Sequence, residues 1–155
     1  LRNNEKIFLF ERTNIKNLDK EMLPFIPDFA VADLSFISIK KISQKISELV
    51  SEDAQLLLLI KPQFELEKEL IENKGVIKSK NLHLKAVGDV VLHFMENNFI
   101  DILGLSFSKI KGAKGNIEYW IFIEKTDKYL KRKNFNYGKI VKDVVDDSYA
   151  FFNLT

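Results

Sequence analysis

The sequence predicts an α/β fold, a mostly parallel sheet packed against helices with an antiparallel last strand. Short apolar runs alternate along the chain with longer segments whose apolar residues recur at helical spacing. The most apolar run, residues 56–60, is hydrophobic on both faces and ends at Lys61 and Pro62. Such a run is typical of a central strand that helices cover on both faces, and strands of this kind are usually parallel.

The first half of the chain carries two more strand patterns and one helix. Residues 7–10 are four apolar residues in succession before a polar stretch, so we expect a buried strand there. Residues 29–32 form another short apolar run, which stops at Asp33. Ser38 is a good N-cap for a helix over residues 39–50, because apolar side chains recur there on one face.

The second half begins with a polar segment, residues 62–80, which we expect to be a functional or mobile loop. Residues 81–97 form the clearest helix, with valine, phenylalanine and methionine on one stripe. Two further strands are expected at residues 100–107 and 117–124. A basic connection then leads to a last amphipathic helix at residues 140–152.

Composition limits the classes of protein that remain. The 155 residues are 46% hydrophobic and 30% charged, which is enough for one globular domain with its own core. The absence of cysteine excludes disulfides, zinc held by thiolates and cysteine nucleophiles, and is typical of the cytoplasm. The net charge of +2 predicts no strong overall field for nucleic acid, and no apolar run approaches the roughly 18 residues that span a bilayer. His83 and His93 would point about 80° apart on one helix, so we expect no metal site.

Three charged residues stand at the ends of predicted strands. Asp33 follows residues 29–32, Lys61 follows residues 56–60, and Glu118 lies at the start of the last strand. The carboxyl ends of parallel strands meet at one edge of a sheet, and an antiparallel last strand begins at that same edge. We therefore expect an acid, amine and acid cluster there. Plain solvated strand ends are the alternative, and the pattern alone leaves both interpretations open.

Four short motifs occur in order along the chain: VADLSFIS at 31–38, IKPQFE at 60–65, KGVI at 74–77 and GAKGNIE at 112–118. Together they resemble the TlyA (haemolysin A) family, which is itself similar to the FtsJ-type ribosomal RNA 2′-O-methyltransferases. Residues 1–2 and 11–16 match this family as well, so the resemblance extends over roughly residues 1–124.

The resemblance implies a Rossmann-like methyltransferase sheet that uses S-adenosylmethionine, and a Lys-Asp-Lys-Glu tetrad for methyl transfer to a ribose hydroxyl. Asp33, Lys61 and Glu118 fall on the last three positions, with Lys61 as the general base and the two acids orienting it. No residue of this chain can be assigned to the first lysine. Asn14 falls on a position whose side chain contacts adenine, Ile15 supplies a backbone contact, and Asp33 also belongs to the cofactor side. Asn14 equally suits a plain turn.

The cofactor pocket is expected to be incomplete in this chain. Relative to the family, we expect the chain to start after the second strand and its helix, and to lack the small N-terminal RNA-binding domain. It contains no G-x-G turn, which such enzymes use to bring backbone close to the cofactor. We expect residues 1–125 to form an N-terminally truncated methyltransferase domain, with a connector and helix in residues 126–155 packed on it. This fragment is expected to be inactive alone and to self-associate through an exposed sheet edge.

The implied substrate is ribosomal RNA or a ribosomal subunit, so polar residues near the cluster are candidate RNA contacts. The candidates are Lys109, Lys111, Lys114 and Asn116, with Lys78 and Lys80 as further members of a basic rim. Scattered solvated lysines are the alternative for this rim. Two other functions stay open: a non-catalytic RNA- or ribosome-binding domain and, disfavoured by the acidic last helix, a haemolysin-type membrane-active protein. We expect a cytoplasmic protein without stable membrane association.

Overall fold

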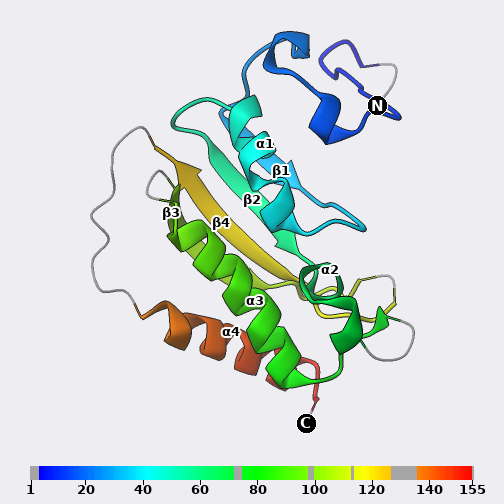
Figure 1. Ribbon diagram of the computed structural model, residues 1–155, viewed down its shortest axis with the longest axis vertical. Coiled ribbons are helices and arrows are strands. Elements are labelled where there is room, and N and C mark those ends of the chain that lie inside the picture. The colour runs from blue at the N-terminus through cyan, green and yellow to red at the C-terminus, as the bar shows by residue number, and fades with distance from the viewer. Residues whose placement is uncertain (1–3, 72–74, 98–99, 113, 127–135, 155) are drawn as a thin grey trace.

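The computed structural model describes residues 4–71, 75–97, 100–112, 114–126 and 136–154. Its centre is a four-stranded sheet in the order β1-β2-β4-β3 (Figure 1). The strands are β1 (Phe29–Ala32), β2 (Gln55–Ile60), β3 (Ile100–Phe107) and β4 (Tyr119–Lys125).

The predicted direction of the strands is confirmed. β1 pairs with β2 in parallel, and β4 pairs with both β2 and β3 in antiparallel orientation. The first three strands therefore run the same way, and the last strand in sequence runs against them from a central position in the sheet. Leu58 and Ile121, which pair across the β2–β4 ladder, are both almost fully buried.

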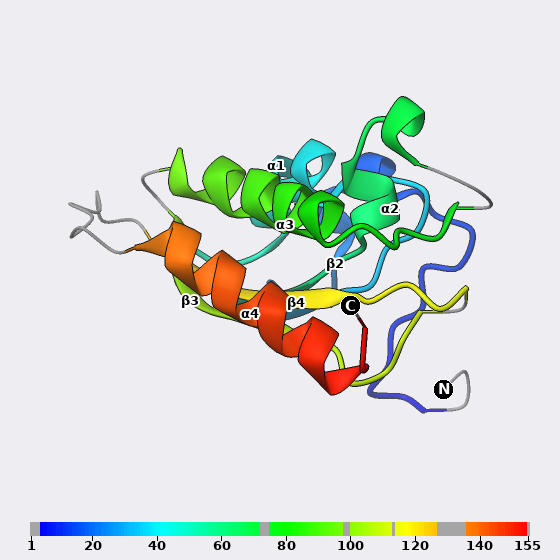
Figure 2. The same cartoon turned by 90° about the horizontal axis from the view of Figure 1, so that it is seen from below.

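Helices pack on one face and along one side of this sheet. They are α1 (Ser43–Leu49), α2 (Pro62–Glu65), α3 (Lys80–Met95) and α4 (Tyr137–Phe151). Figure 2 shows α1 and α3 on the same side of the sheet, with α4 alongside β3. The core lies beneath α3, because Val87, Val90 and Phe94 of that helix are buried against the central strands.

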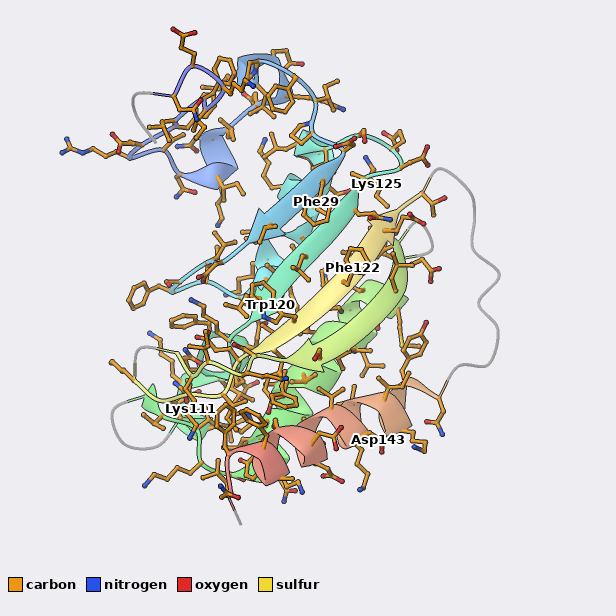
Figure 3. All side chains as sticks on the ribbon, turned by 180° about the vertical axis from the view of Figure 1, so that it is seen from behind. Phe29, Lys111, Trp120, Phe122, Lys125 and Asp143 are labelled. Carbon is orange, nitrogen blue, oxygen red and sulfur yellow. The ribbon has the colours of Figure 1, made fainter. Side chains whose placement is uncertain are left out.

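The interpretation of residues 56–60 as a strand covered on both faces is only half correct. The strand is central, between β1 and β4, but in the part of the chain that the structure describes the helices cover one face. Leu57 on the other face is half-buried, and Trp120 and Phe122 of β4 lie on that face as well (Figure 3). The run of leucines therefore reflects its central place in the sheet rather than a second helical layer.

The strand predicted at residues 7–10 was wrong. These residues adopt neither helix nor strand, and Phe8, Leu9 and Phe10 are 55%, 43% and 39% exposed. Four apolar residues can form a strand only where a neighbouring strand supplies hydrogen bonds, and none of the described strands lies beside them. Phe8 instead makes an edge contact with Phe25, with ring centroids 6.4 Å apart.

Two other segments refine the predictions. The helix expected over residues 39–50 divides into a 3-10 turn, η3 (Ile39–Lys41), and α1, with the Ser38 hydroxyl accepting a hydrogen bond from Lys40 N. The long polar segment contains α2 and a further 3-10 turn, η4 (Lys68–Leu70). No helix among the described residues has the length and apolar character that crossing a membrane requires.

Candidate active site at the carboxyl edge of the sheet

The strand register brings Asp33, Lys61 and Glu118 to one edge of the sheet. Asp33 follows β1 directly and Lys61 follows β2, and these two strands are parallel neighbours. The antiparallel ladder pairs Ile60 with Tyr119, so Lys61 and Glu118 each stand one residue beyond a paired position at the same end. The three residues are far apart in sequence and meet because β4 is inserted next to β2.

Lys61 is the centre of this cluster. Its ammonium nitrogen lies 2.6 Å from Oδ1 of Asp33 and donates to the Ser35 hydroxyl at 3.4 Å. The Lys61 side chain is 13% exposed, whereas that of Asp33 is 61% exposed. The amine is therefore largely covered, and the carboxylate that holds it remains open to solvent.

Glu118 is the buried acid of the cluster, with 9% of its surface exposed. Burial raises the pKa of its carboxyl; the positive charge of Lys61 lowers that pKa in part, and the Asp33 carboxylate raises it further. Its backbone carbonyl accepts from Ser108 N at 2.8 Å, which fixes the start of β4 against the end of β3.

Gly112 leaves room for the Glu118 side chain. A Cβ at position 112 would lie 2.9 Å from Cδ of Glu118 and closer still to Oε1. Any other residue here would have to displace the carboxyl group. Gly112, the first glycine of the GAKGNIE motif, thus allows the close approach of its own turn to the acid in the observed position.

Asn116 has a structural role in place of the predicted RNA contact. It is only 2% exposed, and both polar atoms of its side chain bind backbone groups. Oδ1 accepts from Ile77 N at 2.8 Å, and Nδ2 donates to the Gly75 carbonyl at 2.7 Å. The Asn116 side-chain amide is therefore buried and hydrogen-bonded within the protein, and it does not face a ligand.

The loop after β1 contains features that sequence reasoning missed. Ser38 donates to Oε2 of Glu65 at 2.6 Å, and Ile39 N donates to Oε1 of the same buried carboxyl at 2.8 Å. Burial raises the pKa of Glu65, and the two hydrogen bonds oppose that shift. This pair fastens the loop that carries Asp33 to α2, which begins directly after Lys61. The sequence contains both residues of this contact, Ser38 in the motif DLSFIS and Glu65 in KPQFE, but it does not show that they pair.

Phe36 in the same loop is also unusual. It is 91% exposed and adopts a φ of +64°, a left-handed conformation that is rare for a bulky side chain. Its ring lies 5.3 Å from that of Phe64 in α2. The loop that begins at Asp33 and the helix α2 that follows Lys61 thus present an aromatic pair beside the charged cluster.

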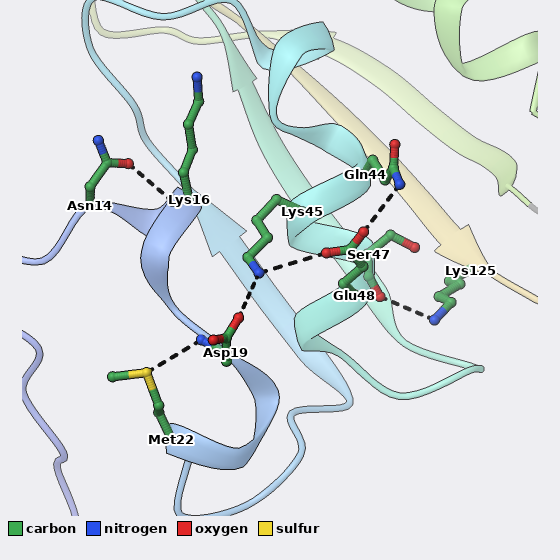
Figure 4. A network of polar contacts seen from close by, with 9 residues as sticks. All are labelled: Asn14, Lys16, Asp19, Met22, Gln44, Lys45, Ser47, Glu48 and Lys125. Carbon is green, nitrogen blue, oxygen red and sulfur yellow. Dashed lines mark hydrogen bonds and ion pairs between the residues drawn. The ribbon is translucent and has the colours of Figure 1, made fainter.

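Asn14 and Ile15 belong to a segment that is attached to α1. The Asn14 side chain caps the 3-10 turn η1 (Ile15–Asn17) by accepting from Lys16 N at 3.0 Å, as Figure 4 shows. Lys45 of α1 pairs at 3.1 Å with Asp19, the N-cap of the next 3-10 turn, η2 (Lys20–Met22). Ile15 packs in part against the core, and Lys16 lines one cleft together with Phe36 and Gln63.

The lysines of the predicted rim have mixed environments. Lys109 and Lys111 lie over the rings of Phe151 and Phe152, at 6.0 Å and 4.5 Å from the ring centroids, and Lys114 is exposed. Lys80 is paired with Asp146 at 2.7 Å, so its charge is already compensated. Lys78 is exposed. The basic connection predicted around residues 128–133 lies outside the described residues.

The described residues offer only part of a cofactor cradle. The chain has no G-x-G turn, and the Asn14 oxygen is already used within its own turn. No group of three or more potential metal ligands comes together in the described ranges. What the site does supply is a covered amine between two acids of different exposure, an arrangement suited to holding and moving a proton.

Fold and site together define an α/β domain with a charged cluster at the carboxyl edge of its sheet. The model of the FtsJ-like methyltransferase family matches residues 1–125, and the chain belongs to this family. Membership implies S-adenosylmethionine as the methyl donor in general terms.

Named relatives share this segment. The chain is 34% identical to the 16S/23S rRNA (cytidine-2′-O)-methyltransferase TlyA of Mycobacterium tuberculosis over 134 residues, which cover 86% of this chain and 50% of that protein. It is 38% identical to Hemolysin A of Brachyspira hyodysenteriae, over 77% of this chain and 50% of that protein. A solved structure of a putative hemolysin from Streptococcus thermophilus superposes with a TM-score of 0.86 at 28% identity, over 99% of this chain and 54% of that one. The chain thus spans about half the length of the curated relatives it matches.

Proposed function

We propose that the protein that carries this chain transfers a methyl group to the 2′-hydroxyl of a ribose in ribosomal RNA. The observation that supports this most directly is the Asp33–Lys61 pair with the buried Glu118 beside it, at the sheet edge where α/β enzymes bind their ligands. Membership of the FtsJ-like methyltransferase family, and relatives named for ribose methylation of ribosomal RNA, support the same reaction. An RNA substrate of this kind also agrees with the cytoplasmic location expected from the sequence.

In this proposal the three residues of the cluster have distinct roles. Lys61 first releases its own proton to solvent, and its neutral Nζ then accepts the proton of the ribose hydroxyl as the oxygen forms its new bond to the methyl carbon, which leaves its donor. Asp33 holds the Lys61 side chain in place through the 2.6 Å contact. Glu118 stabilises positive charge on Lys61 from the buried side of the cluster. S-adenosylmethionine, when bound, supplies the methyl group.

Binding of the two substrates is proposed to involve neighbouring residues. Asn14, Ile15 and Asp33 form the part of the cofactor side that this chain contributes. Lys109, Lys111 and Lys114 are proposed to contact RNA phosphates, because their segment also carries Gly112, which lies against Glu118. Asn116 no longer belongs to this set.

Transfer of tritiated methyl groups to ribosomal subunits tests the function. In the protein that carries this chain, Lys61→Ala is expected to abolish transfer, because no other amine of the described site can take the proton. Lys125→Ala is the matched control: its side chain is 14% exposed, close to the 13% of Lys61, and it pairs with a carboxylate at the opposite end of the sheet. Near wild-type transfer by Lys61→Ala would contradict the assignment. A wild-type protein that binds subunits without methylating them would favour the non-catalytic alternative.

A further inference from the structure

The backbone of Ile77 is held from two sides, directly by Asn116 and, through His83, by Tyr119, and Asn116 and Tyr119 flank Glu118 in the sequence. Its N–H donates to Asn116 Oδ1 at 2.8 Å. Its carbonyl lies 3.1 Å from His83 Nε2, and His83 Nδ1 lies 3.0 Å from the Tyr119 hydroxyl. Because a carbonyl only accepts, His83 donates from Nε2 to Ile77, and neutral Nδ1 accepts from Tyr119. Burial lowers the pKa of His83, which favours this neutral form.

These contacts lie next to Glu118 on both sides of the chain. Asn116 precedes it by two residues, Tyr119 follows it, and Ile117 between them is buried in the core. Asn116 also closes the turn that precedes Glu118, because the backbone carbonyl of Asn116 accepts a hydrogen bond from Gly112 N at 2.9 Å. Gly112 is the residue whose missing Cβ makes room for the Glu118 carboxyl.

We propose that Asn116 is a positioning residue for Glu118, which it holds by fastening the 112–118 segment to the backbone of Gly75 and Ile77. This role explains why both polar atoms of the Asn116 side chain form hydrogen bonds where the KGVI and GAKGNIE motifs contact each other. Without the Asn116 side chain, Ile77 N–H and the Gly75 carbonyl lose their partner, and the turn that carries Gly112 is free to move away from the acid. Only the catalytic consequence of this inference rests on the proposed function.

Two measurements on the 155-residue chain test the proposal without any methylation assay. Carboxyl NMR titration reports the pKa of Glu118, and amide hydrogen exchange reports the protection of Ile77 N–H. In Asn116→Ala the Glu118 carboxyl gains access to water, so its pKa is expected to fall toward the ordinary glutamate value. The charged groups that act on it, Lys61 and Asp33, are unchanged by this substitution. Exchange of the Ile77 amide is expected to accelerate by about tenfold or more.

Ile123→Val is the matched control for a general loss of stability. It removes one buried methyl from the same strand, β4, at the end remote from Glu118. In this variant the pKa of Glu118 is expected to equal that of the wild type. The Ile77 amide is expected to remain protected from hydrogen exchange relative to the other amides, as in the wild type. A folded Asn116→Ala protein in which Glu118 titrates as in the wild type would overturn the proposal.

A milder variant covers the case in which Asn116→Ala does not fold. Asn116→Ser keeps one hydroxyl, which can serve Ile77 N–H or the Gly75 carbonyl but not both in the wild-type geometry. The Glu118 pKa is expected to lie between those of the wild type and the free carboxyl. Loss of Ile77 protection with an unaltered Glu118 titration would again overturn the proposal.

The catalytic consequence is read separately in the protein that carries this chain. Asn116→Ala is expected to lower kcat by about tenfold or more, because the acid is displaced, and to raise KM for RNA by a smaller factor, because Lys111 and Lys114 lie next to or within the same turn. An unchanged kcat would contradict a positioning role. A wild-type protein without methyltransferase activity would refute the proposed function. The NMR titration and the hydrogen exchange would then still test the positioning role of Asn116.

Discussion

Lys61 and Lys125 stand at opposite ends of the β2–β4 ladder in nearly equivalent surroundings. Lys61 follows β2 and pairs with Asp33 at 2.6 Å, and Lys125 closes β4 and pairs with Glu52 at 3.2 Å. Their side chains are 13% and 14% exposed, and in each pair the carboxylate is well exposed. The two ion pairs are therefore expected to contribute similarly to the free energy of unfolding. Of the two lysines, Lys61 also has the buried acid Glu118 beside it.

We expect Lys61→Ala and Lys125→Ala to lower the free energy of unfolding by similar small amounts, about 1 kcal/mol or less. The reason is that an ion pair with a solvent-exposed partner contributes little after screening and the loss of side-chain entropy. Urea unfolding of the two variants measures this. A much larger cost at Lys61 alone would show that this lysine supports the fold, and loss of activity could then no longer be assigned to chemistry.

Gly112→Ala is expected to impair the site, because the added methyl would occupy the space of the Glu118 carboxyl. Methyl transfer should fall and the Glu118 titration should change. Gly88→Ala is the control: it lies within α3, nothing lies within 4 Å of its added Cβ, and alanine there should stabilise the helix by about 0.5–1 kcal/mol. The two alanine substitutions should thus act in opposite directions, and wild-type activity in Gly112→Ala would count against the tight fit.

The buried His83 predicts a pH dependence of stability. Burial lowers its pKa in the folded state, so below the ordinary histidine pKa of about 6.5 the unfolded chain binds a proton that the folded chain does not. This contribution to stability is present at neutral pH and is lost as the pH falls. In His83→Gln the unfolding free energy should rise less steeply between about pH 5 and pH 7 than in the wild type. His93, Glu65 and Glu118 also have shifted pKa values but are present in both proteins. Equal slopes would contradict the prediction.

Self-association through β1 is expected of the 155-residue chain. This strand is one of the two edges of the sheet among the described residues, and Phe29 and Val31 on it are 50% and 59% exposed. Such an edge offers unpaired backbone groups to another chain. Val31→Lys should shift sedimentation toward the monomer, whereas Ile110→Lys, which removes an exposed apolar residue from a loop, should not. Identical behaviour of both variants would place the association elsewhere.

The 155-residue chain is expected to bind S-adenosylmethionine weakly. The chain has no G-x-G turn, and Asn14 uses its oxygen in its own turn, so few groups remain to hold the ligand. Calorimetric titration should show affinity in the millimolar range or weaker. Micromolar binding would show that the residues from Asn14 onward suffice for a cofactor site.

Local patterns predicted most elements of this fold well. The runs at 29–32 and 100–107 coincide with β1 and β3, and the apolar stripe at 81–97 corresponds to α3 within two residues at each end. These segments succeed because burial on one face leaves a periodic trace in the sequence. The strand prediction at 7–10 was wrong because four apolar residues do not specify a partner strand. Without a partner strand, their backbone groups form hydrogen bonds with solvent or within local turns.

The sequence by itself determined which residues could carry the chemistry. Asp33, Lys61 and Glu118 stand beside apolar runs, and the order of the motifs marked them before any pairing was known. Only the tertiary structure decided how they meet, because the place of β4 next to β2 depends on a pairing across more than fifty residues of chain. It also decided that Asn116 faces inward to Gly75 and Ile77 rather than outward to RNA. A motif records which side chains are present, and their direction follows from long-range packing that no local pattern contains.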